Sequence, residues 1–309
     1  MSAPSLNMKI VFIGTVEFSL QMLTTLIMCD VEIVGVITDK DRGINSDYAD
    51  LVPTCKKNNI PCFLTNDVNT LDTIEWIDKK KVDFIFCLGW SRLIKSKLLQ
   101  LPSLGIVGFH PTELPKNRGR HPLIWALVLG LKKTASTFFF MNACADSGDI
   151  ISQQQIIIDD DDDAQSLYKK MIDTAKGQLL TMVPLLHSRK YQPIPQDHLK
   201  ANIWRKRDSD DGKIDWRMGA KQIHNLVRGL THPYVGAYFM LDNNEYRVWK
   251  TQLVDCQGFD NIESGKIIDI DNHGYLLIKC AESCLRLVDV NPALPSMVSG
   301  DYLWVLLLL

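Results

Sequence analysis

The stretch from Gly108 to Trp125 (GFHPTELPKNRGRHPLIW) gathers side chains that can move a proton or hold a charge. They are His110, Lys116, Arg118, Arg120 and His121. Three prolines in the same stretch restrict the path of the loop, and a restricted loop holds its polar groups in place. An imidazole beside a carboxylate is a tunable acid or base near neutral pH. The stretch therefore points to acid–base chemistry at His110, although on the residues alone a structural histidine is an equally good interpretation.

A second polar cluster follows the strand-like run that ends at Met141. Residues 142–149 (NACADSGD) form a turn-rich segment that contains the carboxylate of Asp146. Turns that follow neighbouring strands meet at one edge of a sheet. We therefore expect Asp146 to approach His110 and to complete a His–carboxylate pair.

Strand-like and helix-like segments alternate through the first half of the chain. Apolar and β-branched runs predict strands at 8–14, 31–38, 60–64, 82–89, 104–110, 135–141 and 150–158. Helical spacing predicts helices at 18–28, 51–59, 68–80, 93–100 and 164–186. This order predicts an α/β fold with a doubly wound, mostly parallel, Rossmann-like sheet. Such sheets bind ligands at the carboxyl ends of strands, which here include Gly14, Gly89 and His110.

The composition changes between residues 187 and 213, where prolines and charges predict a linker. Beyond it, a helix at 220–229 and several short alternating strands are typical of a smaller β-barrel-like (OB-like) domain. We therefore expect a catalytic domain at 1–188, a linker at 189–213 and a β-rich domain at 214–309. The apolar ending Leu306–Leu309 is interpreted as a frayed edge strand, a dimer contact or a truncation, so a homodimer is one arrangement considered.

The chain has 309 residues, of which 46% are hydrophobic and 23% charged, and its net charge is −2. This composition suits a chain with a buried core and argues against intrinsic disorder. No apolar run reaches the roughly 20 residues of a membrane span, and the N-terminus lacks the features of a signal peptide. We therefore expect a cytoplasmic protein with no membrane partner, and the near-neutral charge argues against a nucleic-acid partner.

Several signatures of nucleotide and metal sites are missing from the chain. No GxGxxG follows the first strand, and neither GxxxxGK[ST] nor GxSxG occurs. The eight cysteines are scattered, so we expect reduced, buried thiols rather than disulfides or a zinc site. The run Asp159–Asp163 is expected to form a loop that caps the next helix, because contiguous carboxylates fan out instead of converging on a metal.

Four segments resemble the family of formyltransferases that use 10-formyltetrahydrofolate. Residues 14–18 (GTVEF) are similar to the family's GTPEF loop, and residues 110–127 (HPTELPKNRGRHPLIWAL) to its H-x-S-L-L-P-K-Y-R-G-x-x-P-I-x-W-A pattern. Residues 145–150 (ADSGDI) are similar to its D-x-G-x-I segment. The stretch from DGKIDW to IHNLVRGLTHPYVGAYF resembles the family's C-terminal domain, especially in the sugar-modifying branch. The likeness covers nearly the whole chain.

The resemblance implies transfer of a formyl group from 10-formyltetrahydrofolate, as co-substrate and without a metal, to an amine. The family uses an Asn–His–Asp trio. Its His carries over to His110, as proton donor and stabiliser of the oxyanion. Its Asp carries over to Asp146, which would keep His110 protonated and help to manage the proton of the amine, through water.

The family's Asn falls on Gly108, which has no carboxamide to offer. Losing one donor to an oxyanion costs about 2.7–4 kcal/mol in the transition state. Three explanations are considered: another donor replaces it, water fills the gap, or the protein is a weak or inactive relative. The replacement donors considered are Asn117, Asn142 and His121. We favour replacement, because His110 and Asp146 are both intact.

The resemblance also implies residues that bind the two substrates. Those expected to contact the folate are Arg92, Leu93, Ile94, Arg120, Asn142, Ala143, Cys144 and Ala145. Those expected to contact the acceptor are Thr15, Lys116 and Arg118. No residue is expected to bind a metal.

Two acceptors occur in this family, a nucleotide-linked amino sugar and initiator methionyl-tRNA. The tRNA branch must neutralise phosphates, largely with its C-terminal domain. From Lys200 to the end the chain has 13 Lys and Arg against 14 Asp and Glu, a net charge of −1. We therefore expect a nucleotide sugar as substrate, with methionyl-tRNA as the alternative and a catalytically weak folate-binding relative as the third interpretation.

Overall fold

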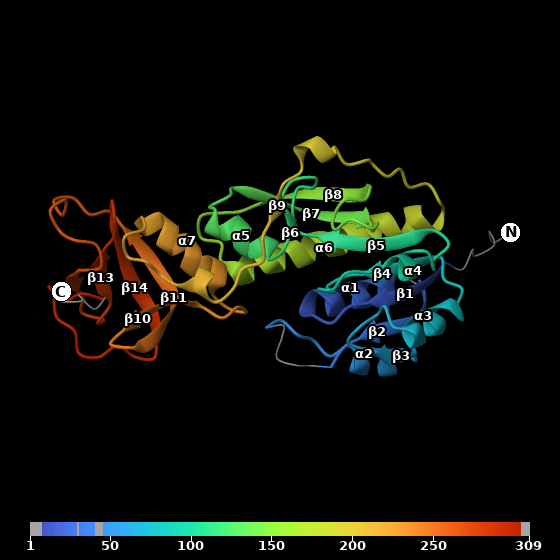
Figure 1. Ribbon diagram of the computed structural model, residues 1–309, viewed down its shortest axis with the longest axis horizontal. Helices are drawn as coiled ribbons and strands as arrows, with labels where there is room; N and C mark the ends of the chain where they lie inside the picture. Colours follow the sequence, from blue (N-terminus) through green and yellow to red (C-terminus); the bar gives the residue numbers. More distant parts are fainter. Residues whose placement is uncertain (1–7, 30, 41–45, 304–309) are drawn as a thin grey trace. The chain divides into compact units, whose positions relative to one another are not determined.

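The computed structural model of the protein describes residues 8–29, 31–40 and 46–303 (Figure 1). Backbone contacts divide the chain into two compact units. The first comprises residues 1–122, 133–157 and 169–205, and the second comprises residues 123–132, 158–168 and 206–309. The expectation of an edge strand or dimer contact at Leu306–Leu309 concerns residues outside the described part of the chain.

A seven-stranded sheet forms the centre of the first unit. Its strands are β1 (Lys9–Ile13), β2 (Glu32–Thr38), β3 (Cys62–Leu64), β4 (Phe84–Cys87), β5 (Gly105–His110), β7 (Lys133–Phe140) and β8 (Ile150–Ile157). They lie in the order β3-β2-β1-β4-β5-β7-β8, and β7 alone runs opposite to the others, antiparallel to both β5 and β8. This arrangement confirms the predicted mostly parallel, Rossmann-like sheet. The strand order reverses between β1 and β4, where folds of this kind bind their ligands.

Helices flank this sheet (Figure 1). The helices are α1 (Glu17–Met28), α2 (Val52–Lys57), α3 (Leu71–Asp78), α4 (Ser96–Leu99) and α6 (Ala164–His187). Strands β1 and β4 are almost completely buried, which explains why their sequences are continuous apolar runs rather than alternating ones. None of the helices in the described ranges is long and apolar enough to cross a membrane.

The end of the first unit is a strap, residues 189–205, which the sequence predicts as part of a linker. The strap contains a short 3₁₀ helix, η1 (His198–Lys200), and a two-residue strand, β9 (Ile203–Trp204). Strand β9 pairs in parallel with β6 (Arg118–Gly119), which lies in the proline-rich loop after β5. Gly119 has φ of +109°, and a Cβ there would lie 2.2 Å from the carbonyl oxygen of Trp204. Only glycine therefore permits this close approach.

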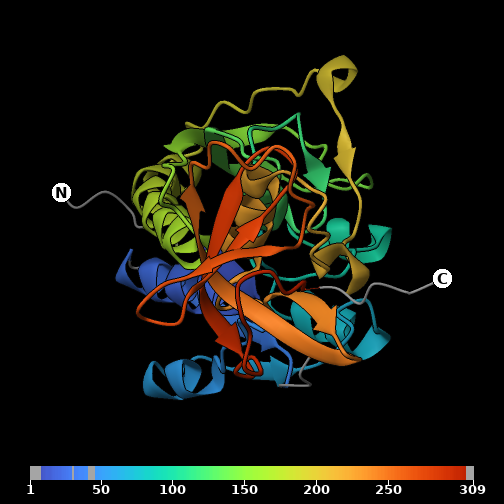
Figure 2. The same cartoon turned by 90° about the vertical axis from the view of Figure 1, so that its left-hand side faces the viewer.

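The second unit is built around a five-stranded antiparallel sheet, whose strands are orange to red in Figure 2. The strands are β10 (Ala237–Leu241), β11 (Asn244–Val254), β12 (Ile267–Ile270), β13 (Leu276–Lys279) and β14 (Cys284–Asn291), in the order β10-β11-β14-β13-β12. The unit also contains most of α5 (Pro122–Val128), the short η2 (Asp210–Gly212) and α7 (Ala220–Leu230). The buried face of α7, with Ile223 and Val227, joins Phe239 and Val248 of the sheet in one core. A small β-rich second domain is thus present.

The acidic run Asp159–Asp163 forms a loop in the second unit that encloses a buried arginine. Asp163 accepts a hydrogen bond from the Ser166 backbone N–H at 2.9 Å, which confirms the predicted cap at the start of α6. The Arg228 guanidinium donates to the backbone carbonyl oxygens of Asp159, Asp160 and Asp162. Burial lowers the pKa of Arg228. Among the described residues no cluster of three or more metal-binding side chains occurs.

The cysteines differ from expectation at one pair. Cys256 and Cys284 form a disulfide, so the prediction that all eight thiols are reduced is wrong for these two. Cys256 precedes β12 by a loop and Cys284 begins β14, and the disulfide holds their Cα atoms 5.7 Å apart. The two cysteines are 28 positions apart in the sequence, and this spacing alone does not predict that they pair. The other six cysteines are free.

Candidate active site

His110 is the last residue of β5 and is only 5% exposed. Its Nε2 lies 2.8 Å from the backbone carbonyl oxygen of Asn117. A carbonyl oxygen can only accept, so Nε2 carries the hydrogen and donates it. The other ring nitrogen, Nδ1, lies 3.7 Å from Oδ2 of Asp146. The predicted approach of Asp146 to His110 is therefore confirmed.

Asp146 lies in the turn after β7 and has a left-handed backbone, with φ of +53°. Its Oδ2 accepts a hydrogen bond from the Gly119 backbone N–H at 3.0 Å. One carboxylate thus connects three segments: its own turn, β6 and the end of β5. A carboxylate in this position can stabilise the imidazole when it is charged.

The loop between His110 and Arg118 is fixed by side chains of the neighbouring strands. Thr137 of β7 donates to the carbonyl oxygen of Thr112 at 2.6 Å, and Gln153 of β8 donates to that of Leu114 at 3.0 Å. The peptide bond between Leu114 and Pro115 is cis. These contacts position the Asn117 carbonyl that receives the hydrogen bond from His110.

Two residues that the sequence analysis missed, Gln196 and Asn202, reach this site from the strap. The Gln196 amide nitrogen donates to the carbonyl oxygens of Asp146 and Gly148, at 3.0 and 2.7 Å, and its oxygen accepts from Arg118 at 2.7 Å. Asn202 accepts from the Asn117 backbone N–H at 2.8 Å and donates to the Asn117 side-chain oxygen at 3.1 Å. No motif marks either residue, because the strap has the composition of a linker.

Most of the residues expected to bind folate lie on two exposed segments. Arg120 donates to the carbonyl oxygen of Ser91 at 2.5 Å, which links the loop after β6 to the segment 90–94. Arg92 lies 3.7 Å from the Asp39 carboxylate and over the ring of Trp90, whereas Leu93 is exposed and Ile94 is buried.

The other expected folate contacts, Asn142 to Ala145, form the exposed tip of the turn that carries Asp146. The Asn142 side-chain oxygen accepts from the Cys144 backbone N–H and from the Ser147 hydroxyl. These two bonds fix the shape of the turn before it reaches Asp146.

The three residues expected to bind the acceptor are spread over different surroundings. Thr15 is buried after β1, where its backbone N–H donates to the Ser19 hydroxyl at 3.0 Å. Lys116 is exposed on the loop after β5. Arg118 is already engaged, because its guanidinium binds Gln196 and lies 3.0 Å from Nδ1 of His198. Gln196 thus links Arg118 to Asp146. The described contacts do not link Thr15 or Lys116 to the His–Asp pair in this way.

Gly108 lies two residues before His110 on β5, in register with Phe139 of β7. A Cβ at this position would lie 2.7 Å from Cγ of Met141 and 3.0 Å from the ring of Phe139. Two apolar side chains therefore occupy the space that a larger residue would need. The side-chain oxygens of Asn117 and Asn142 both accept hydrogen bonds, which leaves their NH₂ groups as donors.

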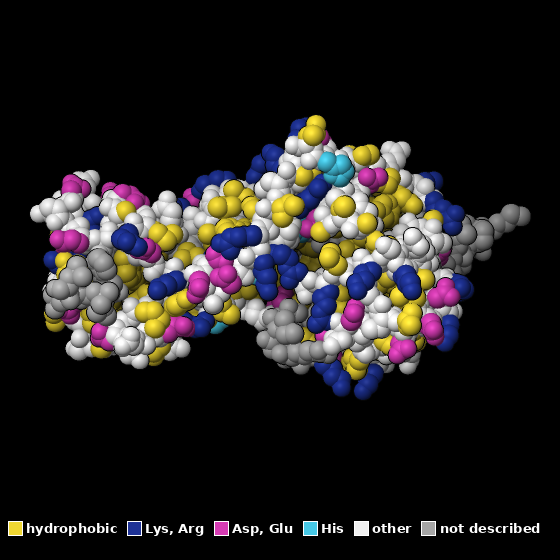
Figure 3. Space-filling view, in the orientation of Figure 1, with side chains coloured by type: hydrophobic (Ala, Val, Ile, Leu, Met, Phe, Trp, Pro, Cys, Tyr) yellow, Lys and Arg dark blue, Asp and Glu magenta, His cyan; other side chains and the backbone are white. Residues whose placement is uncertain are grey.

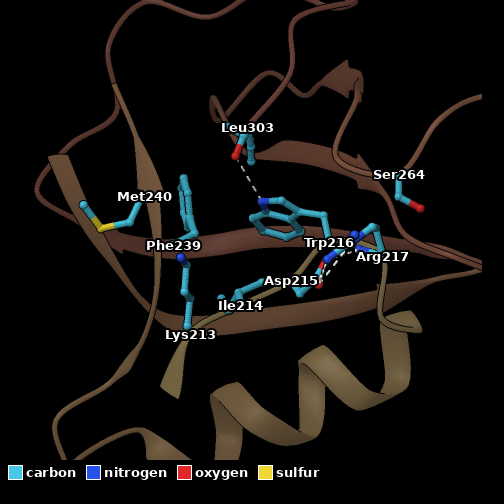
Figure 4. Close-up of a pocket in the computed structure, with 9 residues that line it drawn as sticks. All are labelled: Lys213, Ile214, Asp215, Trp216, Arg217, Phe239, Met240, Ser264 and Leu303. Carbon is cyan, nitrogen blue, oxygen red and sulfur yellow. Dashed lines mark hydrogen bonds and ion pairs between the residues drawn. The ribbon is translucent and has the colours of Figure 1, made fainter. Parts of the chain in front are cut away.

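A separate cavity of about 450 Å³ lies within the second unit (Figure 4). Its walls include Trp216, whose indole N–H donates to the carbonyl oxygen of Leu303, and Arg217, which is paired with Asp215. None of the site residues expected from the sequence lines this cavity.

Known proteins match this chain along almost its whole length. Residues 8–183 match the formyl transferase family, and residues 206–304 match the formyl transferase C-terminal domain. A methionyl-tRNA formyltransferase of Alkaliphilus oremlandii is 29% identical over 288 residues, which cover 92% of each chain. The bifunctional polymyxin resistance protein ArnA of Wigglesworthia glossinidia brevipalpis is 30% identical over 287 residues, 92% of this chain and 43% of that protein.

A solved structure with a similar fold is the N-formyltransferase from Helicobacter canadensis in complex with folinic acid and dTDP-3-aminofucose. It superposes with a TM-score of 0.70 and 18% identity, over 91% of this chain and 98% of that one. The two matched domains together cover most of the chain, and the chain therefore belongs to the formyl transferase family.

Proposed function

We propose that this formyltransferase transfers a formyl group from 10-formyltetrahydrofolate to the amine of a nucleotide-linked amino sugar. The observation that carries the choice of acceptor is the near-neutral charge of the chain from Lys200 to the end. The choice of reaction rests on the family and on the His110–Asp146 pair. In this proposal residues 1–188 supply the chemistry, and residues 214–309 form the smaller domain.

We assign the proton transfers of this reaction to His110 and Asp146. The acceptor amine attacks the formyl carbon, and a tetrahedral oxyanion forms and collapses as the bond to N10 of the folate breaks. Protonated His110 stabilises the oxyanion and gives a proton to N10 as it leaves. Asp146, 3.7 Å away, stabilises the charged imidazole and receives the proton of the amine through water.

The folate is assigned to the segment 90–94, Arg120 and the turn Asn142–Ala145. The indole nitrogen of Trp90 and the hydroxyl of Thr15 are buried, and neither has a hydrogen-bond partner in the described part of the chain. Buried polar groups normally have a partner, so these two atoms are suited to contact a bound ligand. The neighbour from Helicobacter canadensis holds folinic acid, which supports a folate as co-substrate.

The charges of the second unit favour a small acceptor over a tRNA. Four of its basic side chains, Arg217, Arg247, Lys266 and Arg286, lie within 4 Å of a carboxylate. Arg228 and Lys279 are buried and donate to backbone carbonyl oxygens. On the face shown in Figure 3, acidic and basic side chains are interspersed over the second unit. A surface that binds many phosphates needs a basic excess, which is absent here.

Methionyl-tRNA is the second candidate acceptor. It is favoured by the relative from Alkaliphilus oremlandii, whose name assigns it that substrate at 29% identity. The neighbour with dTDP-3-aminofucose supports the sugar instead, although at 18% identity its likeness establishes the fold alone. A folate-binding protein with little turnover is the third candidate, because Gly108 stands where the family has its Asn.

An acceptor panel separates the three candidates. The protein is incubated with 10-formyltetrahydrofolate and dTDP-, UDP- and GDP-linked amino sugars, or with charged initiator tRNA, and formylated product is detected by mass. We expect formylation of at least one nucleotide sugar and none of the tRNA. Formylation of the tRNA alone would overturn the sugar proposal. Folate binding without turnover on any acceptor would favour the non-catalytic candidate.

A further inference from the structure

The strap holds the turn that carries Asp146 through a single buried side chain. Gln196 is 6% exposed, and both ends of its amide are used. The nitrogen donates to the carbonyl oxygens of Asp146 and Gly148, and the oxygen accepts from Arg118. This pattern requires a donor and an acceptor on the same group, which an amide supplies and a carboxylate does not. The backbone of Asp146 is therefore tied to the loop that carries Arg118.

The same strap holds the partner of His110 through Asn202. Asn202 binds both the backbone N–H and the side-chain oxygen of Asn117, and its own carbonyl oxygen accepts from the Arg118 backbone N–H at 3.0 Å. Asn117 has a left-handed backbone, with φ of +61°, and it is the residue whose carbonyl receives the Nε2 hydrogen of His110. The orientation of the imidazole thus depends on a residue that Asn202 fixes.

We propose that Gln196 and Asn202 are positioning residues, which together set the relative geometry of Asp146 and His110. The proposal rests on the proposed function for its catalytic meaning, since neither side chain contacts the reacting atoms. Acid–base groups work only when held close to the productive geometry, and a displacement of about 1 Å can lower the rate about 100-fold. Gln196 binds the backbone of Asp146, and Asn202 binds the backbone of Asn117, whose carbonyl oxygen accepts the hydrogen bond from His110.

The position of the strap itself does not depend on these two side chains. Backbone hydrogen bonds connect Ile194 to Ile150 in both directions, and Arg120 to Trp204. Replacing either amide therefore removes a contact to the site while β9 remains paired with β6. This separation allows the positioning role to be tested without unfolding the strap.

The test uses the full chain with four substitutions. Gln196→Leu and Asn202→Ala remove the contacts. Asn202→Asp keeps an acceptor for the Asn117 N–H, and the Asn117 amide can rotate to donate to the second oxygen. Leu199→Ser, at a strap residue that is 97% exposed, is the matched control. We expect kcat to fall about 10- to 100-fold in the first two variants, with little change in KM for the folate or in Tm, and within about threefold in the others.

A second readout does not depend on the identity of the acceptor. In ¹⁵N NMR of the histidine rings, with His110→Gln used to assign the signal, we expect neutral His110 to carry its hydrogen on Nε2. Asn202→Ala should shift that signal toward exchange between the two ring nitrogens, and Asn202→Asp should restore it. If no acceptor supports turnover, the proposed function fails, but this spectrum still tests whether Asn202 sets the orientation of the His110 ring. Unchanged ring signals in Asn202→Ala, or kcat losses that only follow a lower Tm, would overturn the inference.

Discussion

Gly108 has no side chain to offer beside His110, and Met141 and Phe139 lie against the space where one would be. The sequence alone identifies the missing amide, because the surrounding motif aligns with that of the family. It does not reveal the apolar filling, which depends on the antiparallel register of Gly108 with Phe139. A replacement donor is the explanation that we favour, and the NH₂ group of Asn142 is available for that role because its side-chain oxygen accepts two hydrogen bonds.

Restoring the amide tests whether its role is already filled. We expect Gly108→Asn to give less than a tenfold gain in kcat, both alone and combined with Met141→Ala, which makes room for the new side chain. Gly108→Ala is the control for the added Cβ. A gain of about 100-fold or more, the size of one missing oxyanion donor, would show that nothing replaces the family's Asn.

The His–Asp pair itself gives a direct prediction. His110→Ala and Asp146→Ala should each lower kcat at least about 100-fold, because each removes a group that handles a proton in the transfer. Stopped assays for released formylated product measure the loss, and Asp149→Ala, an exposed carboxylate of the same turn, serves as the control. An Asp146→Ala protein with near-normal turnover would refute the assignment.

Among the secondary-structure elements, those marked by apolar runs or helical spacing were predictable, including short ones such as β3 and β4, whereas the two-residue strands were not. Helix α6 and strands β1, β4 and β5 follow from apolar spacing, since each buries a continuous face. Strands β6 and β9 have two residues each, which is too short for any periodicity. Their pairing arises from contacts between distant segments, so Gln196 and Asn202 could not be recognised before the fold was known.

The buried Arg228 guanidinium holds the loop Asp159–Asp163 by donating hydrogen bonds to its backbone carbonyl oxygens. We expect Arg228→Met to lower the free energy of unfolding by about 3 kcal/mol, because three backbone carbonyl oxygens lose a charged donor. Urea titration measures this change. Arg217→Met, at an exposed ion pair, should leave the midpoint of the urea titration nearly unchanged. An Arg228 variant as stable as that control would contradict the role.

For the molecule as a whole, sequence determines the reaction class more firmly than the acceptor. Both matched domains are formyltransferase domains, and the likeness extends over nearly all described residues. The acceptor depends instead on how charges are distributed over a surface. Here 13 basic residues from Lys200 onward are balanced by 14 acidic ones, and several are paired or buried. That balance argues against a tRNA, and the resemblance of the stretch ending in HPYVGAYF to the sugar-modifying branch is the other reason to favour a nucleotide sugar.

The hydrogen bonds between Asn117 and Asn202 join residues 85 positions apart. Contacts of such long range form only after the chain between them has collapsed, and they slow folding. During synthesis, β5 and its histidine leave the ribosome long before the strap does. A nascent chain that ends before Gln196 has every residue of the His–Asp pair and lacks the segment that fixes it. If the strap has the proposed positioning role, we expect such a chain to gain competence for the reaction only once the strap has been synthesised.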